Sequence, residues 1–164
     1  MGNITKMKQI PEYIDVYDLY KADIARLVDE FSTVSSLLEV QKRLDTTTIY
    51  HKSLTLYKLG REHELLQSLP YTKKVVYDLL KVRDHNVVTY RCVLPHTCYS
   101  WHKDGTDACL HIPIITNDGS RFVYEDKAIH MPADGSVYLV NNLRYHSFMN
   151  GGGTQRVHLT FEKL

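Results

Sequence analysis

Long apolar runs are absent from this sequence of 164 residues. No stretch approaches the roughly 18 consecutive apolar residues that a membrane-spanning helix needs. The opening residues Met-Gly-Asn-Ile-Thr-Lys also lack the apolar core of a signal peptide. We therefore expect no membrane partner and a cytoplasmic location.

Cysteine is scarce, with only Cys92, Cys98 and Cys109 in the chain. An odd, low number in a chain of this length does not predict a disulfide framework. The spacing contains no Cys-x-x-Cys pair that would support a zinc site. Free thiols in a reducing cytosol are the simplest interpretation.

An excess of charge of either sign is also lacking, because 20 basic residues face 19 acidic ones and leave a net charge of +1. A nucleic-acid-binding domain usually carries a marked basic excess, so we expect no nucleic-acid partner. The hydrophobic content of 43% is that of a folded chain rather than a disordered one. The length suits one domain with one core, and we predict a single domain over residues 1–164.

The pattern of residues changes near residue 85, from helical signals before it to strand signals after it. Before that point, apolar residues recur at steps of three and four over residues 16–31, which predicts a helix. A second helix is predicted over residues 72–81, with Thr72 as its N-cap. Residues 32–59 are ambiguous, although 46–50 have the composition of a strand. We interpret residues 1–85 as a helical or mixed buttress.

The second half has the composition of short strands separated by turns. Asn-Asp-Gly-Ser at 117–120 and Ala-Asp-Gly at 133–135 are typical of tight turns. Pro113 lies inside an apolar run and indicates a sheet edge or a bulge. Strands are expected over residues 87–94, 109–116, 121–124, 128–131, 136–140 and 156–161. This spacing predicts a mainly β fold, a sandwich or jelly roll over residues 86–164, preceded by helices.

Two histidines and an aspartate carry the strongest chemical signal. His102 and Asp104 are two residues apart, so alternation along a strand places them on one face, and His146 follows later in the chain. Two imidazoles and one carboxylate are the ligand set that holds Fe(II) and leaves its other positions open. A His-x-Asp pair arises readily by chance among nine histidines. The context strengthens it, since Arg156 follows His146 by ten residues and is a candidate to clamp a carboxylate cosubstrate.

Other polar residues have weaker signals. Arg91 shares a strand face with Thr89, and a buried arginine needs an anionic partner, so Arg91 is a candidate contact for cosubstrate or substrate. His158 shares a face with Arg156. Asn142 is either a hydrogen-bond partner of a ligand histidine or a turn residue. We interpret His51 as a surface or structural residue.

Residues 90–161 resemble the aspartyl/asparaginyl β-hydroxylase-type branch of the Fe(II)/2-oxoglutarate-dependent dioxygenases. The matching stretches are Leu-Pro-His-Thr at 94–97 leading to His102, Leu-His-Ile-Pro at 110–113, Asp-Gly-Ser-Val-Tyr at 134–138, and Tyr-His-Ser at 145–147 leading through Asn150 to Arg156. The resemblance implies a double-stranded β-helix (a jelly roll, cupin-like) with iron at one end.

The resemblance also implies roles for individual residues. His102 and His146 would be iron ligands, and Asp104 completes a triad that some members of this branch lack. Arg156 would pair with the distal carboxylate of 2-oxoglutarate, where its planar fork allows a bidentate bond. His111 falls near the other carboxylate of the cosubstrate. Arg91 falls about where some relatives place a small hydroxyl residue against the cosubstrate, which is a departure from the family pattern. We nevertheless expect Arg91 to be a cosubstrate contact.

Three hypotheses follow. The first is a hydroxylase that uses O₂, Fe(II) and 2-oxoglutarate to hydroxylate an amino-acid side chain; we favour a peptide or protein residue as substrate, with a free amino acid as the alternative. The second is a non-catalytic, cupin-like module that binds a small anion in the same pocket. The third is a structural domain with a fortuitous histidine pair. The complete triad together with Arg156 favours the first.

Overall fold

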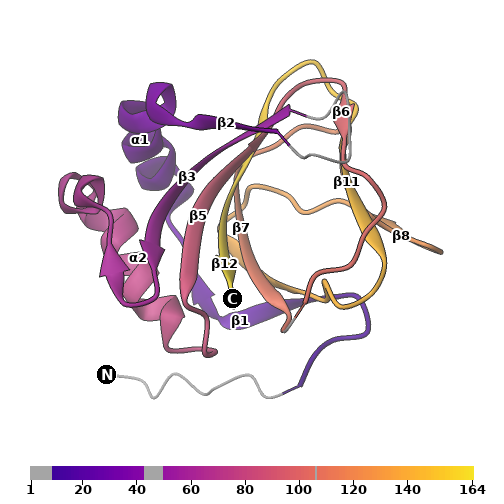
Figure 1. Ribbon diagram of the computed structural model, residues 1–164, viewed down its shortest axis with the longest axis horizontal. Coiled ribbons are helices and arrows are strands. Elements are labelled where there is room, and N and C mark those ends of the chain that lie inside the picture. The colour runs from indigo at the N-terminus through magenta and orange to yellow at the C-terminus, as the bar shows by residue number, and fades with distance from the viewer. Residues whose placement is uncertain (1–8, 43–49, 106) are drawn as a thin grey trace.

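The computed structural model describes residues 9–42, 50–105 and 107–164, and it consists of two antiparallel sheets flanked by helices (Figure 1). The helices are α1 (Ile24–Val34), η1 (Ser35–Leu37), η2 (Glu64–Ser68) and α2 (Pro70–Leu80). The strands of the large sheet, in spatial order, are β1 (Ile14–Lys21), β10 (Ser136–Val140), β7 (Cys109–Ile115), β12 (Arg156–Glu162), β5 (Val87–Val93), β3 (Tyr50–Lys58) and β2 (Glu39–Lys42), with β4 (Arg61–Glu62) paired to β3. The small sheet runs β6 (Thr97–Cys98), β11 (His146–Asn150), β8 (Ser120–Tyr124) and β9 (Ala128–Ile129).

From β5 onward the chain winds between the two sheets. Strands β5, β7, β10 and β12 belong to the large sheet, and β6, β8, β9 and β11, which lie between them in sequence, belong to the small one. This alternation closes the strands into a double-stranded β-helix, as the sequence predicts (Figure 1).

The first half of the chain belongs to the same sheet as the second half, although their residue patterns differ. Strands β1, β2 and β3 extend the same large sheet, with β1 paired to β10 and β3 paired to β5. The helices α1 and α2 lie on the outer face of this sheet (Figure 1). Residues 1–85 therefore buttress the β core with strands as well as helices, and one domain over the whole chain remains our interpretation.

Strand β12 shows how the sequence creates an apolar and a functional face. Val157, Leu159 and Phe161 are fully buried in the main hydrophobic cluster, on the side of the helices. Arg156 and His158 alternate with them and therefore lie on the opposite face, toward the small sheet. The period of two thus places the packing and the chemistry on different sides of one strand.

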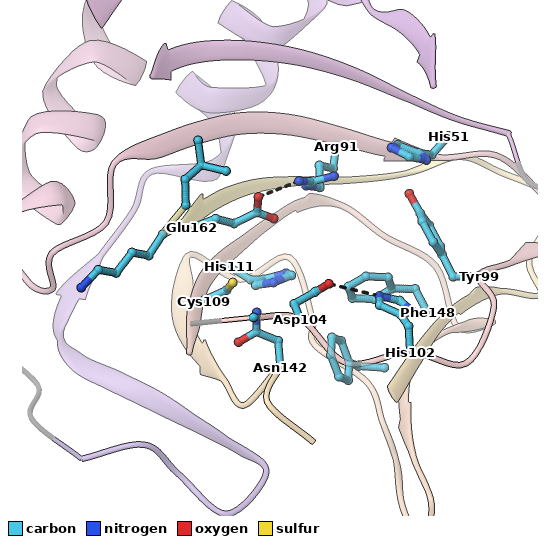
Figure 2. A pocket seen from close by; sticks show the side chains of 14 residues that line it. His51, Arg91, Tyr99, His102, Asp104, Cys109, His111, Asn142, Phe148 and Glu162 are labelled. Atoms are coloured by element: carbon cyan, nitrogen blue, oxygen red, sulfur yellow. Dashed lines mark hydrogen bonds and ion pairs between the residues drawn. The ribbon is translucent and has the colours of Figure 1, made fainter. Parts of the chain in front are cut away.

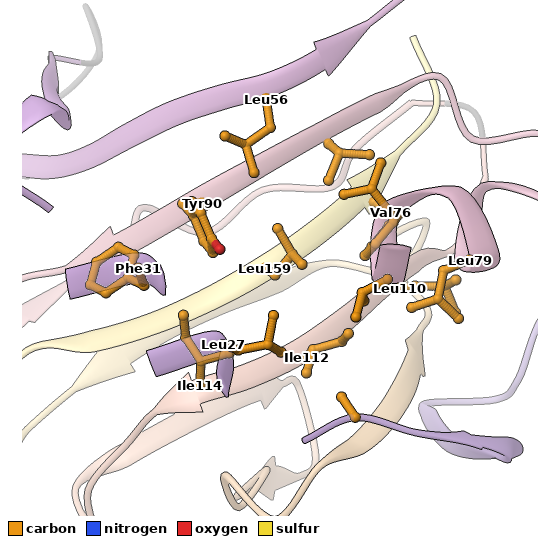
Figure 3. Close-up of a cluster of buried hydrophobic side chains, with 14 of the residues drawn as sticks. Leu27, Phe31, Leu56, Val76, Leu79, Tyr90, Leu110, Ile112, Ile114 and Leu159 are labelled. Atoms are coloured by element: carbon orange, nitrogen blue, oxygen red, sulfur yellow. The ribbon is translucent and has the colours of Figure 1, made fainter. Parts of the chain in front are cut away.

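The helices pack through the apolar face of the sheet (Figure 3). Leu27 and Phe31 of α1 are buried against it, and the Phe31 ring lies edge-on to Tyr90 with centroids 5.1 Å apart. Each fully buried large apolar side chain contributes about 1.5–3 kcal/mol relative to its exposed state. The remaining members of the contact include Leu56, Val76, Leu79, Leu110, Ile112, Ile114 and Leu159.

The two helices are also joined by a hydrogen-bonded cap. The Glu30 carboxylate of α1 accepts bonds from the backbone N–H groups of Tyr71 and Thr72, at 2.8 and 2.7 Å. These groups belong to the first turn of α2, which has no side-chain cap of its own. The prediction that Thr72 is the N-cap is therefore wrong: the helix starts at Pro70, and the Thr72 hydroxyl instead bonds to that of Tyr90.

Several other predictions need correction. The helix expected over residues 16–31 is two elements, because β1 pairs with β10 before α1 begins at Ile24, where Asp23 caps the helix. Pro113 does not mark an edge, since β7 lies between β10 and β12; a register shift of β12 against β7 at this point agrees with the predicted bulge. Most of the strand predicted over 46–50 lies outside the described residues.

Strands predicted from local composition agree well elsewhere. The predicted strand over 136–140 has the bounds of β10, and the others differ from β5, β7, β8, β9 and β12 by one or two residues at an end. The turn at 133–135 ends in Gly135, which has φ +89° and whose backbone accepts a hydrogen bond from Ala22. No helix within the described ranges is long and apolar enough to cross a membrane.

Candidate metal centre and pocket

The structure brings the three predicted metal ligands together. His102 and His146 form a backbone bridge between antiparallel segments, with reciprocal N–H to carbonyl bonds of 3.0 and 2.7 Å. Asp104 follows His102 by two residues, and its backbone N–H donates to the Asn142 carbonyl. The Asp104 carboxylate lies 3.7 Å from His102 Nε2 and 3.6 Å from His146 Nε2. One potential ligand atom of each of the three residues lies within 4.8 Å of the others.

Both histidines are oriented by local backbone bonds. The Nδ1 atom of His102 lies 2.7 Å from the Ser100 carbonyl, and that of His146 lies 2.8 Å from the Arg144 carbonyl. A carbonyl only accepts, so each Nδ1 carries the proton and each Nε2 presents a lone pair. This tautomer leaves Nε2 able to bind a metal, and it is fixed by the kind of partner that metal-ligating histidines normally have.

The buried state of His146 fits a metal. Its side chain is fully buried, stacks on the Phe122 ring at 4.8 Å, and has an Nε2 atom without a hydrogen-bond partner among the described residues. Buried polar atoms are nearly always satisfied, so an orphaned lone pair facing a carboxylate makes this position suited to a cation. The donor set of two nitrogens and one hard oxygen suits Fe(II).

Asp104 is held in its ionised form. Burial on its own raises the pKa of this carboxyl group, but its interactions with the His146 and His102 side chains and the charge of Arg91 outweigh it, and the pKa is lowered. Half of the side chain remains exposed. Asp104 therefore offers an anionic oxygen at the open side of the cluster.

Behind the cluster, Arg156 begins a short chain of buried polar groups. Its guanidinium is almost fully buried, donates to His158 Nδ1 at 3.0 Å and lies 5.0 Å over the Phe148 ring. His158 Nδ1 is in turn 3.1 Å from His111 Nδ1. An arginine only donates, so His158 Nδ1 must accept both bonds and His111 Nδ1 carries a proton. Burial, with Arg156 nearby, lowers the pKa of both imidazoles well below the usual range, which keeps them neutral.

Arg156 is a buried cation without a carboxylate partner in the described part of the chain. Burial lowers its pKa to about 10, so the fold disfavours its charge. The His158 Nε2 atom beside it is also buried and unpartnered. A ligand that brings an anionic group to this position would satisfy both.

A pocket of about 330 Å³ opens beside the triad (Figure 2). His102, Asp104, His111 and Arg91, four of the predicted site residues, line it. The other lining residues include His51, Tyr99, Cys109, Phe122, Asn142, Phe148, Glu162 and Lys163. His146 and Arg156 lie behind this lining, buried under the aromatic rings of Phe122 and Phe148.

Arg91 differs from Arg156 in its surroundings. Its Nη2 donates to the Glu162 carboxylate at 2.6 Å, and about 30% of its side chain is exposed. Burial alone lowers the pKa of Arg91, but the adjacent Glu162 charge reverses this and raises it. Arg91 reaches the pocket as predicted from the sequence, with a protein carboxylate already beside it.

Of the two interpretations offered for His51, a surface or a structural residue, the surface interpretation is wrong. His51 is buried and lines the pocket next to Tyr99, with ring centroids 5.0 Å apart. Tyr99, Phe148 and Glu162 were not singled out from the sequence. Glu162 shares the alternating face of Arg156 and His158 on β12, and this periodicity is the signal that would have found it.

Comparison with known proteins connects these residues to a family. The sequence profile of the aspartyl/asparaginyl β-hydroxylase family matches residues 20–163, which is most of the chain. A search of curated protein sequences gave no match.

Solved structures share the fold at low sequence identity. A prolyl-4-hydroxylase from Pseudomonas putida is 14% identical with a TM-score of 0.58, covering 93% of this chain and 94% of its own. A viral collagen prolyl hydroxylase from Paramecium bursaria Chlorella virus-1, solved with 2-oxoglutarate, is 13% identical with a TM-score of 0.56, covering 92% and 97%. An oxidoreductase of the 2-oxoglutarate–Fe(II) oxygenase family from Burkholderia pseudomallei is 14% identical with a TM-score of 0.53, covering 84% and 75%.

Proposed function

Since the chain belongs to the aspartyl/asparaginyl β-hydroxylase family, we propose that it is an Fe(II)- and 2-oxoglutarate-dependent dioxygenase that hydroxylates an amino-acid side chain. The observation that carries this proposal is the cluster of His102, Asp104 and His146, with both Nε2 atoms directed at one carboxylate. The structural neighbours named as prolyl hydroxylases and a 2-oxoglutarate–Fe(II) oxygenase support the same chemistry.

The residues divide into an iron-binding and a cosubstrate-binding group. His102, Asp104 and His146 would hold the iron. Arg156 pairs with a carboxylate of 2-oxoglutarate, while His111 stands between Arg156 and the pocket. When bound, iron and 2-oxoglutarate together activate O₂ for insertion of oxygen into a C–H bond.

The protein itself supplies orientation and a shielded environment. The carbonyls of Ser100 and Arg144 orient the two imidazole rings so that both Nε2 atoms face the Asp104 carboxylate. The rings of Phe122 and Phe148 cover His146 and Arg156 and exclude water from them. The substrate side chain enters through the pocket beside Asp104, carried by a polypeptide or by a free amino acid.

An anaerobic titration tests this function. Metal-free protein receives Fe(II) and then 2-oxoglutarate while the visible charge-transfer band of the chelate is monitored. We expect a band in the wild type and at least a 100-fold weaker response in His146→Ala. His96→Asn is the matched control, because His96 is exposed in a turn with φ +54°, which asparagine tolerates.

The outcomes separate the competing hypotheses. A folded wild type that binds iron but shows no band would remove 2-oxoglutarate and favour a small-anion binding module. A band without succinate formation, after exposure to O₂ and candidate substrates, would favour the same module. Binding of neither iron nor 2-oxoglutarate would leave a structural domain.

A further inference from the structure

One wall of the pocket carries a charge pair that the catalytic assignments do not use. Arg91 and Glu162 meet there, and Figure 2 shows them on one side with His102 and Asn142 on the other and Asp104 between. With Asp104 and Lys163, four charged residues line one small pocket. Such a lining is costly to desolvate unless the ligand brings complementary charges.

The residues of this wall leave some of their hydrogen-bonding capacity unused. Arg91 uses Nη2 for Glu162, whereas its buried Nε has no partner among the described residues. Across the pocket, Asn142 is only 6% exposed, and its Oδ1 is likewise buried and unpartnered. One unused donor and one unused acceptor, beside a carboxylate, therefore belong to the same pocket lining.

Arg91 is oriented away from the cosubstrate anchor. It lies opposite His158 in the β5–β12 ladder but bonds to Glu162, four residues further along β12. Arg156 begins the same strand, six residues before Glu162, which is roughly 20 Å of extended chain. The guanidinium of Arg91 thus serves the end of the pocket that is remote from Arg156.

We propose that this wall recognises the α-carboxylate and α-ammonium groups of a free amino acid, which is the substrate of the site. Arg91 donates to the carboxylate, and Glu162 and Asn142 accept from the ammonium group. The inference rests on the proposed function and names its substrate class. A residue within a polypeptide carries neither charge, so its neutral amides would desolvate the Arg91–Glu162 pair without adding a charge to either partner. This choice revises the peptide substrate that we favoured from the sequence.

The test compares free and capped amino acids on the intact protein loaded anaerobically with Fe(II) and 2-oxoglutarate. The probes are the twenty common amino acids, each also as its N-acetyl derivative and its carboxamide. Binding is measured by calorimetry and by perturbation of the chelate band. We expect at least one free amino acid to bind, and each cap to weaken it by 10-fold or more.

Two charge-neutralising variants assign the groups. Arg91→Gln should weaken the free amino acid at least 10-fold but leave the carboxamide unchanged, since that probe has no carboxylate. Glu162→Gln should weaken the free amino acid at least 10-fold but leave the N-acetyl derivative unchanged, since that probe has no ammonium group. Arg121→Gln and Glu125→Gln are the controls, because neither residue lines the pocket. The cap comparison on the wild type still decides if a variant does not fold.

Capped probes that bind as tightly as free ones would overturn the inference. So would a chelate band that responds to none of the free amino acids, and in that case the proposed iron and cosubstrate site would stand. Absence of the band itself would overturn the proposed function and this inference with it.

Discussion

Replacing Arg156 by methionine should stabilise the metal-free protein and abolish cosubstrate binding. The guanidinium is nearly fully buried, has no carboxylate partner among the described residues, and has a pKa lowered from 12.5 to about 10 by burial. Methionine has a similar unbranched stem and removes the charge. Arg156 is thus expected to be a residue kept for binding at the expense of stability.

The size of the effect follows from the lowered pKa. A change from 12.5 to about 10 corresponds to roughly 3 kcal/mol by which the fold disfavours the cation. Because the pKa is lowered in the fold, this penalty is fully present below pH 10 and therefore at neutral pH. Loss of the bond from Arg156 to His158 offsets about 1 kcal/mol. The net gain in the free energy of unfolding is then about 2 kcal/mol.

Urea unfolding of metal-free wild type and Arg156→Met at pH 7 measures this difference directly. Arg121→Met is the control, because Arg121 is partly exposed and its guanidinium bonds a backbone carbonyl. A variant less stable than wild type by 1 kcal/mol or more would refute the desolvation argument. Unchanged affinity for 2-oxoglutarate in Arg156→Met would refute its assignment as the carboxylate anchor.

Two further predictions concern the fold. Glu30→Ala should lower the free energy of unfolding by about 1–2 kcal/mol in urea denaturation, because the first turn of α2 loses both bonds from its carboxylate; a loss no larger than that of the exposed Glu125→Ala would contradict the cap. Gly135→Ala should cost about 2 kcal/mol or more in the same assay, since its φ is +89° and a Cβ would lie 2.3 Å from the Ala22 carbonyl oxygen. Gly60→Ala is the control, because Gly60 has φ +84° but open space where the Cβ would lie, so it measures the cost of the backbone conformation alone. Equal losses of unfolding free energy in the two variants would argue against the steric contact at Gly135.

The metal cluster could be predicted because its signals are local. His102 and Asp104 are two residues apart, so strand alternation places them on one face. The antiparallel bridge between His102 and His146 follows from the β-helix that the sequence predicts. The strands around them are short, rich in β-branched and aromatic residues and separated by recognisable turns, so composition alone located most of them. Alternation along β12 places Glu162 on the functional face, but its bond to Arg91 was not predictable in this way, because Glu162 is not directly opposite Arg91 in the strand pairing.

Strand β1 shows where local pattern was misleading. Its apolar residues have helical spacing, yet Val16 and Leu19 are 46% and 63% exposed, while Tyr17 is buried. The pairing of this segment with β10 decides its conformation, and that pairing is a tertiary contact over more than 100 residues. The burial of His51 was not predictable for the same reason, since it depends on the pairing of β3 with β5.

The division of the site between the two sheets has a mechanical consequence. His146 begins β11 of the small sheet and His102 bridges to it, whereas Arg156 and His111 belong to β12 and β7 of the large sheet. A cosubstrate held by iron at one end and by Arg156 at the other would act as a strut across the mouth of the β-helix. A motion that separates the two sheets would then have to break one end of this connection. Binding of the cosubstrate would therefore also make the β-helix more rigid.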